Sequence, residues 1–133
     1  MNAVIRVLLV GGNEDIIEEL SQMLGGEEGI VVVGKARSGE EALAVAKKLS
    51  PDVILMLTDE RMPGGNVIDT TAAISEAQLP ARVIIITGNP VRYLVSAIKA
   101  GAAGLLPKNI SHDELLSAIR KIHLLSPGSF SSR

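Results

Sequence analysis

The sequence of 133 residues contains no cysteine and no tryptophan, and its only aromatic rings of the Tyr and Phe type are Tyr93 and Phe130. The lack of cysteine excludes disulfides, thiolate catalysis and cysteine-ligated zinc sites, and it is typical of a protein of the reducing cytoplasm. The scarcity of aromatic rings excludes a base-stacking platform for nucleic acid. Basic residues are not in excess, with 13 Lys and Arg against 15 Asp and Glu, so direct phosphate-backbone binding is not expected. No apolar run is long enough to span a membrane.

Short apolar runs rich in β-branched residues alternate with longer segments of helical periodicity. Several of these runs are continuous rather than alternating, which is typical of strands that are covered by helices on both faces. The pattern predicts a parallel sheet. The expected strands are Ile5–Val10, Ile30–Ala36, Val53–Leu57, Arg82–Thr87 and Gly104–Leu106.

Capping residues mark the starts of four helices, at Asn13, Ser38, Asn89 and Ser111, whereas a helix between Val67 and Ala77 has the weakest pattern. Five strand–helix units joined by short loops predict a single doubly wound α/β sandwich. The apolar stripes that helical spacing directs toward the sheet include Ile16, Leu20, Met23 and Leu24, then Val91, Leu94, Val95 and Ile98, and finally Leu115, Ile119, Ile122 and Leu125.

In such sheets ligands bind at the carboxyl ends of the strands. Asp59 follows the third expected strand, Thr87 ends the fourth and Lys108 follows the fifth. A carboxylate, a hydroxyl and an ammonium group at one edge suit an aspartyl-phosphate site, where the carboxylate attacks phosphorus and the other two groups stabilise the phosphoryl oxygens.

The chain resembles the receiver domain of two-component response regulators, particularly the NarL/LuxR-type regulators. The resemblance implies a flavodoxin-like (βα)5 fold with strand order 2-1-3-4-5, a receiver domain over residues 1–125, and a linker over residues 126–133 toward an output domain absent from this chain. The matching segments are Ile5–Val10, Val33–Ala36, Ser38–Leu43, Pro51–Leu55, Arg61–Gly64, Ala81–Ile84, Ile98–Gly104 and Asp113–Leu116.

Two departures from the family affect the metal site. The family places two acidic residues after its first strand, where they hold Mg²⁺, but this chain has Gly11 and Gly12 there. The loss of both carboxylates predicts weak Mg²⁺ binding. Glu14 and Asp15 lie nearby and are the substitute candidates, although both also complement the positive end of the first helix.

Further departures affect the acceptor and the switch. Counting from Pro51-Asp52, the family's phospho-acceptor aspartate falls on Leu57, whereas counting back from Arg61-Met62-Pro63 it falls on Asp59. Two residues of extended chain displace Asp59 by roughly 6 to 7 Å. The family's aromatic switch position is Leu105, and its lysine-proline pair is reversed here as Pro107-Lys108, so a cis bond at Pro107 is not assured.

Three hypotheses follow. The first is a non-enzymatic signalling module, impaired in Mg²⁺-dependent phosphorylation, which receives signals from a sensor histidine kinase or another signalling protein and contacts nucleic acid only through its output domain. It would form a homodimer through its last helix, with Leu116 and Leu124 as contacts. The second is a working receiver that accepts phosphate on Asp59. The third is a small flavodoxin-like nucleotide or flavin binder that uses Gly11-Gly12-Asn13 as a phosphate-binding turn.

Overall fold

Five parallel strands form one sheet in the order β2-β1-β3-β4-β5 in the computed structural model, which describes residues 4–125 and 130. The order and the parallel pairing confirm the predicted doubly wound α/β fold. Only β5 differs from its expected bounds, because it ends one residue later, at Pro107. The strands are β1 (Ile5–Val10), β2 (Ile30–Ala36), β3 (Val53–Leu57), β4 (Arg82–Thr87) and β5 (Gly104–Pro107).

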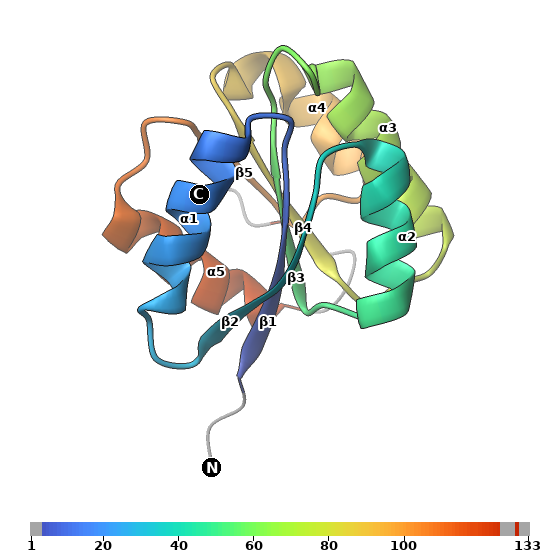
Figure 1. Cartoon of the computed structure of the whole chain (residues 1–133). Helices are drawn as coiled ribbons and strands as arrows, with labels where there is room; N and C mark the ends of the chain where they lie inside the picture. Colours follow the sequence, from blue (N-terminus) through green and yellow to red (C-terminus); the bar gives the residue numbers. More distant parts are fainter. Residues whose placement is uncertain (1–3, 126–129, 131–133) are drawn as a thin grey trace.

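Helices cover both faces of the sheet (Figure 1): α1 and α5 lie on one face, and α2, α3 and α4 lie on the other. The helices are α1 (Glu14–Gly25), α2 (Gly39–Leu49), α3 (Gly64–Glu76), α4 (Pro90–Ala100) and α5 (His112–His123). The four expected caps are confirmed by their side-chain hydrogen bonds, and Ser111 forms a full capping box with Glu114. Helix α3 begins three residues earlier than predicted, at Gly64, without a side-chain cap.

The core has two layers because the central strands are buried on both sides. Side chains of alternate residues enter one layer beneath α1 and α5, with Leu9 and Leu55 at its centre, and another beneath α2, α3 and α4, with Ile54 and Ile85 at its centre. All of these four side chains are almost fully buried. Within the described residues no helix combines the length and the apolar character that a bilayer crossing needs.

Helix α4 presents a different face to the sheet from the one that its apolar stripe predicts. Ala97 and Ala100 are buried, whereas the four larger aliphatic side chains, Val91, Leu94, Val95 and Ile98, are exposed. Small alanine side chains allow the helix to pack closely on the neighbouring elements. Hydrophobic periodicity alone does not distinguish an alanine face from a face of larger aliphatic residues.

Two smaller expectations about the helices are also wrong. Ile17 rather than Ile16 is buried beneath α1, and the Ile16 side chain is 40% exposed. Leu116 is buried in the core, which removes it from any surface contact, while Leu124 remains 82% exposed.

The Leu106–Pro107 peptide is trans, like all the peptide bonds of the described residues.

Gly101 ends α4 in the left-handed conformation, with φ of 95°. A Cβ atom at this position would also lie 2.6 Å from the Ser75 hydroxyl oxygen. We expect Gly101→Ala to lower the free energy of unfolding by about 1–2 kcal/mol, because a non-glycine residue is strained there. Urea denaturation measures the change. Gly25→Ala is the matched control, since a Cβ there meets no atom within 4 Å, and a loss of similar size in both variants would contradict the prediction.

Candidate functional site

The Asp59 carboxylate joins two of the loops at the carboxyl end of the sheet. Its Oδ2 atom accepts hydrogen bonds from the backbone N–H groups of Gly12 (2.9 Å) and Asn13 (3.1 Å), which follow β1. Its Oδ1 atom accepts hydrogen bonds from the backbone N–H groups of Arg61 (2.8 Å) and Met62 (2.7 Å) in its own loop. A carboxylate has about four lone-pair sites, so these donors use its accepting capacity in full.

These contacts set the protonation state of Asp59. Partial burial is the largest single influence and acts to raise the pKa of the carboxyl group. The four backbone N–H donors stabilise the ionised form, and together they outweigh burial and hold the pKa below its ordinary value. Asp59 is therefore an ionised hydrogen-bond acceptor at neutral pH, committed to the backbone of two loops.

Gly12 is required where the two loops meet. A Cβ atom on Gly12 would lie 2.4 Å from the Arg61 Cβ and 3.0 Å from the Asp59 Oδ1 atom. The Arg61 guanidinium also donates a hydrogen bond of 3.1 Å to the Gly12 carbonyl. The loop after β3 thus occupies the space in front of the end of β1, where the resemblance would place acidic side chains.

Leu57, the other acceptor position by motif counting, is the last residue of β3. Its side chain is only 8% exposed and belongs to the core layer beneath α1 and α5. A Cβ atom on Gly11 would lie 3.5 Å from the Leu57 Cβ and 3.0 Å from the Ile17 Cδ1. The ends of β1 and β3 are therefore packed together by apolar contacts.

The phospho-acceptor candidate Asp59 and the two phosphoryl-contacting candidates, Thr87 and Lys108, all lie at the strand ends, and the Lys108 backbone N–H donates a hydrogen bond of 3.1 Å to the Thr87 carbonyl. Asp59 and Lys108 line the same pocket. Thr87 is almost fully buried, and its hydroxyl accepts a hydrogen bond of 3.2 Å from the Asn89 backbone N–H at the start of α4. Leu105, at the switch position, is buried beside Ile85 of β4 in the core layer beneath α2, α3 and α4.

The substitute metal ligands lie on the other side of the β1 loop. Glu14 forms an ion pair with Arg37, which follows β2, and Glu14 and Asp15 line a separate hollow that also contains Lys35. Among residues 4–125, no three His, Cys, Asp or Glu side chains are grouped so as to hold a metal ion. Because Asp59 is already saturated by N–H donors, the side chains present do not fit a Mg²⁺ ion, which prefers several oxygen ligands.

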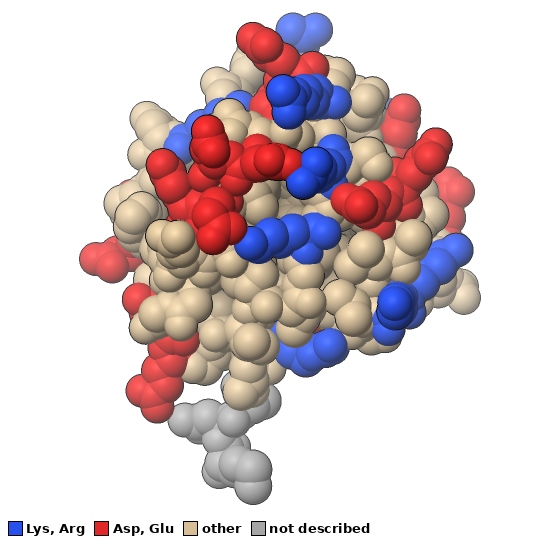
Figure 2. Space-filling model, in the orientation of Figure 1, with Lys and Arg blue, Asp and Glu red and all other residues tan. Residues whose placement is uncertain are grey.

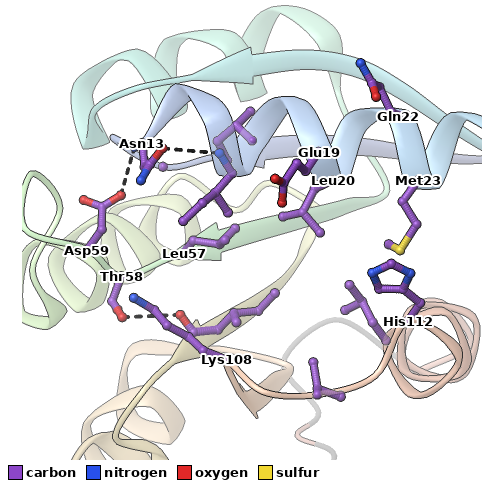
Figure 3. Close-up of a pocket in the computed structure, with 16 residues that line it drawn as sticks. Asn13, Glu19, Leu20, Gln22, Met23, Leu57, Thr58, Asp59, Lys108 and His112 are labelled. Carbon is purple, nitrogen blue, oxygen red and sulfur yellow. Dashed lines mark hydrogen bonds between the residues drawn. The ribbon is translucent and has the colours of Figure 1, made fainter.

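A pocket of about 600 Å³ opens between α1 and α5 at the strand ends, and we call it the α1–α5 pocket (Figure 3). Its polar residues at the strand ends are Asn13, Thr58, Asp59 and Lys108, and its far end carries His112. Glu19 and Gln22 are the polar residues that α1 contributes. The apolar wall from α1 consists of Ile16, Ile17, Leu20 and Met23. The remaining apolar wall consists of Leu57, Ile86, Ile110 and Leu115.

Sequence reasoning missed this pocket. Thr58 lies between β3 and Arg61-Met62-Pro63, where the chain is two residues longer than the family pattern, and this extra length was the only feature of the sequence that pointed to a change at the strand ends. No motif in the sequence connects His112 with the other lining residues. Ile110 and Met23 meet the pocket only because α1 and α5 lie on the same face of the sheet. The distance between two helices that are far apart in the sequence cannot be predicted from local residue patterns.

The charges around the site are mixed in sign. Figure 2 shows basic and acidic side chains interspersed on the face that includes α1 and β2. Exposed ion pairs join these two elements, with Lys35 Nζ 2.7 Å from Glu18 Oε2. The Lys35 ammonium holds the pKa of Glu18 below its ordinary value through a hydrogen bond and its charge. This face therefore has no large single-sign patch that would attract a polyanion.

The chain is similar to known signalling proteins over most of its length. A family model described as the response regulator receiver domain matches residues 7–120. The response regulator GacA of Pseudomonas aeruginosa is 34% identical over 121 residues, which are 89% of this chain and 55% of that protein. The nitrate/nitrite response regulator protein NarL of Escherichia coli is 32% identical over 116 residues, which are 86% of this chain and 53% of that protein. The chain spans about half the length of these relatives.

Solved structures agree with this similarity. The signal receiver domain of the putative response regulator NarL from Mycobacterium tuberculosis superposes with a TM-score of 0.83 at 29% identity, covering 91% of this chain and 97% of that one. The response regulator domain of Thermotoga maritima CheB superposes with a TM-score of 0.83 at 31% identity, covering 93% and 99%. The strand order found here is thus shared with structures of known receiver domains.

Asp59→Asn tests the role of the carboxylate. The variant replaces one accepting oxygen with an amide NH₂ group that faces backbone donors, and we expect it to lower the free energy of unfolding by about 1–3 kcal/mol at neutral pH. Since the pKa of Asp59 is lower in the folded state, its stabilising effect is complete above the unfolded-state pKa of about 3.9 and is lost as pH falls through the folded-state pKa. The difference between wild type and variant should therefore narrow below about pH 4.

Urea denaturation at a series of pH values measures this difference. Asp69→Asn, at an exposed position of α3, is the matched control and should leave stability nearly unchanged. Equal stability of wild type and Asp59→Asn at neutral pH, or a difference that widens on acidification, would show that Asp59 does not brace the two loops.

Proposed function

The chain belongs to the response-regulator receiver domains, and from that premise we propose that it is a receiver whose signal does not depend on an aspartyl phosphate. The observation that carries the proposal is the state of the Asp59 carboxylate, whose two oxygen atoms accept four backbone hydrogen bonds. The other position that motif counting offers as the acceptor is occupied by Leu57, a buried apolar residue without a nucleophilic atom.

Phosphoryl transfer to a carboxylate needs a free oxygen lone pair aimed at phosphorus and cations that neutralise the phosphoryl oxygens. Attack by Asp59 would break the hydrogen bonds that join its loop to the β1 loop. The receiver family uses Mg²⁺ for this chemistry, and Gly11 and Gly12 supply no carboxylate for it here. Weak Mg²⁺ binding and poor phosphorylation follow together.

In this proposal residues 1–125 form the receiver, and residues 126–133 begin a linker to an output domain. Residues 126–129 and 131–133 lie outside the described residues. Support comes from the relatives, which are about twice as long as the matched segment and include one named as a transcriptional regulatory protein. The chain would act in the cytoplasm as a signalling module rather than an enzyme, with a sensor histidine kinase or another signalling protein as partner. Nucleic acid would be contacted only by the output domain.

The same proposal includes a homodimer through α5, with one of the two expected contact residues. Leu124 is exposed just beyond the end of α5, and it keeps the role of a contact residue that Leu116 loses by being buried. The Leu124 side chain is 82% exposed, so it is the position where a partner would cover apolar surface.

A phosphorylation-competent receiver is the second candidate. It is favoured by the presence of Asp59 and Lys108 in one pocket and by the low pKa that keeps Asp59 ionised. A flavodoxin-like nucleotide or flavin binder has less support. The backbone N–H groups of Gly12 and Asn13, which would hold a phosphate in such a protein, already donate to Asp59.

Incubation with acetyl phosphate and Mg²⁺ separates the first two candidates. We expect the intact mass of the protein to show no phosphoryl adduct, under conditions where a receiver with the complete acidic set is modified. Asp59→Asn and Asp69→Asn run in parallel identify the position of any adduct. A stoichiometric adduct that disappears only in Asp59→Asn would contradict the proposal and support phosphorylation of Asp59.

Restoring the acidic pair is the second test. We expect Gly11→Asp combined with Gly12→Asp not to restore phosphorylation by acetyl phosphate, because the new Cβ atom at position 12 would overlap the Arg61 Cβ and place a second carboxylate against Asp59. The new Cβ atom at position 11 would also crowd the Ile17 side chain. The double variant should also be less stable in urea denaturation than wild type. Adding Arg61→Gly removes the side chain that overlaps residue 12 and should recover part of that stability. Efficient adduct formation in the double variant would show that the missing metal ligands are the only defect.

A further inference from the structure

We propose that the α1–α5 pocket binds an amphipathic organic carboxylate, with its head group at Lys108 and its apolar body between α1 and α5. The inference rests on the proposed function in one respect, because without an aspartyl phosphate the Lys108 ammonium has no phosphoryl oxygen to contact. Everything else in it comes from the shape, the lining and the charges of the pocket.

The pocket has the size and wall composition of a small-molecule site. Its volume of about 600 Å³ lies within the roughly 300–1,000 Å³ that is usual for ligand pockets. Leu20 from α1, Leu57 and Ile86 from the sheet and Ile110 from the loop before α5 give aliphatic surface on opposite walls. Figure 3 shows Leu20 and Leu57 on this hollow. An apolar ligand body would remove the half-buried Leu20 and Ile110 side chains from water, which favours binding, while Leu57 and Ile86 are already buried and form the floor.

The strand end of the pocket offers a cation without a counter-ion. Lys108 is exposed, and within the described part of the chain no carboxylate lies within ion-pair distance of its ammonium group. Asp59 lines the same pocket, but both of its oxygen atoms are engaged by backbone N–H groups. Figure 3 shows the Lys108 side chain reaching toward the end of β3, where Thr58 lies. An anionic head group would complete this end of the pocket.

The neighbouring groups favour a head group with a single negative charge. The Thr58 hydroxyl donates a hydrogen bond of 3.4 Å to the Ile86 carbonyl. Lys108 supplies the cationic donor at this end, and the Asn13 side-chain amide, which also lines the pocket, is a neutral donor there. Glu19 also lines the pocket, and its carboxylate opposes a second negative charge on the ligand. Asp59 lies at the same end and is also ionised, so one ammonium group faces two carboxylates, and this balance fits a carboxylate better than a phosphate dianion.

Occupancy of the pocket would reach the elements that transmit a signal. The ligand body would contact both α1 and α5, and its head would contact the Lys108 loop that precedes α5. Met23 and His112 form the far end of the pocket on these two helices (Figure 3). A bound ligand would therefore favour one separation of α1 and α5, and α5 leads into the segment that we propose as a linker.

Titration with decanoate, followed by methyl NMR of the whole chain, tests the proposal. We expect saturable shifts of the Leu20, Leu57 and Ile110 methyl signals. Decanol, which has the same chain and a neutral head, should bind at least about tenfold more weakly. Lys108→Met should weaken decanoate binding by a similar factor and leave decanol binding unchanged. Lys99→Met, on α4 in the opposite layer, is the matched control and should change neither affinity.

Leu20→Glu provides a second variant, because a carboxylate on the half-buried α1 wall should weaken both ligands without removing Lys108. The proposal is wrong if decanoate causes no saturable shifts at these methyl groups, or if decanoate and decanol bind equally and Lys108→Met changes neither. Sedimentation gives a further test. The proposal is also wrong if the wild type is a dimer that decanoate dissociates, and if the Lys108→Met dimer is equally sensitive to decanoate, because a second copy of the chain then covers the pocket.

The acetyl phosphate assay on the same preparation keeps the two proposals separate. A phosphoryl adduct on Asp59 would overturn the proposed function, while the dependence of decanoate binding on Lys108 would still stand. Absence of an adduct together with absence of decanoate binding would leave the proposed function intact and overturn the pocket proposal alone.

Discussion

The structure at the strand ends depends on one carboxylate. Asp59 accepts hydrogen bonds from two backbone N–H groups of the loop after β1 and from two of its own loop after β3, and these bonds hold the two loops against each other. Such charge-assisted hydrogen bonds are stronger than neutral ones, and two of the four, those from Gly12 and Met62, are partly buried. A group with this role has little freedom to act as a nucleophile, because any chemistry on its oxygen atoms removes the contacts that position it.

Other departures from the receiver pattern fit around this contact. Arg61 lies so close to Gly12 that no side chain fits there, and Leu57 joins the apolar layer beneath Ile17. The missing acidic pair, the insertion after β3 and the apolar residue at the end of β3 are therefore parts of one packing arrangement. What remains open beside it is a pocket with aliphatic walls and one unpaired ammonium group, within the described residues.

The outcomes for the helices show where periodicity is sufficient. In α5 the spacing of Leu115, Ile119 and Ile122 predicts the buried face correctly, although Leu116 is also buried beside it. In α4 the larger aliphatic side chains face outward and Ala97 packs inward. Either of two apolar faces of α4 could pack on the sheet. Which face does so depends on the space that the neighbouring elements leave, and the sequence of the helix does not specify that space.

The sequence by itself determined the strands, the caps, the parallel sheet and the identity of the polar residues at the strand ends, because these depend on local periodicity and on residue chemistry. It also indicated that Leu57 and Asp59 compete for one motif position. The role of Asp59, in contrast, depends on the packing of distant segments. Two of its four N–H donors, Gly12 and Asn13, are more than 40 residues away along the chain. The α1–α5 pocket is likewise a property of the fold, because its walls come from the first and last helices, and their separation is set by packing on the sheet.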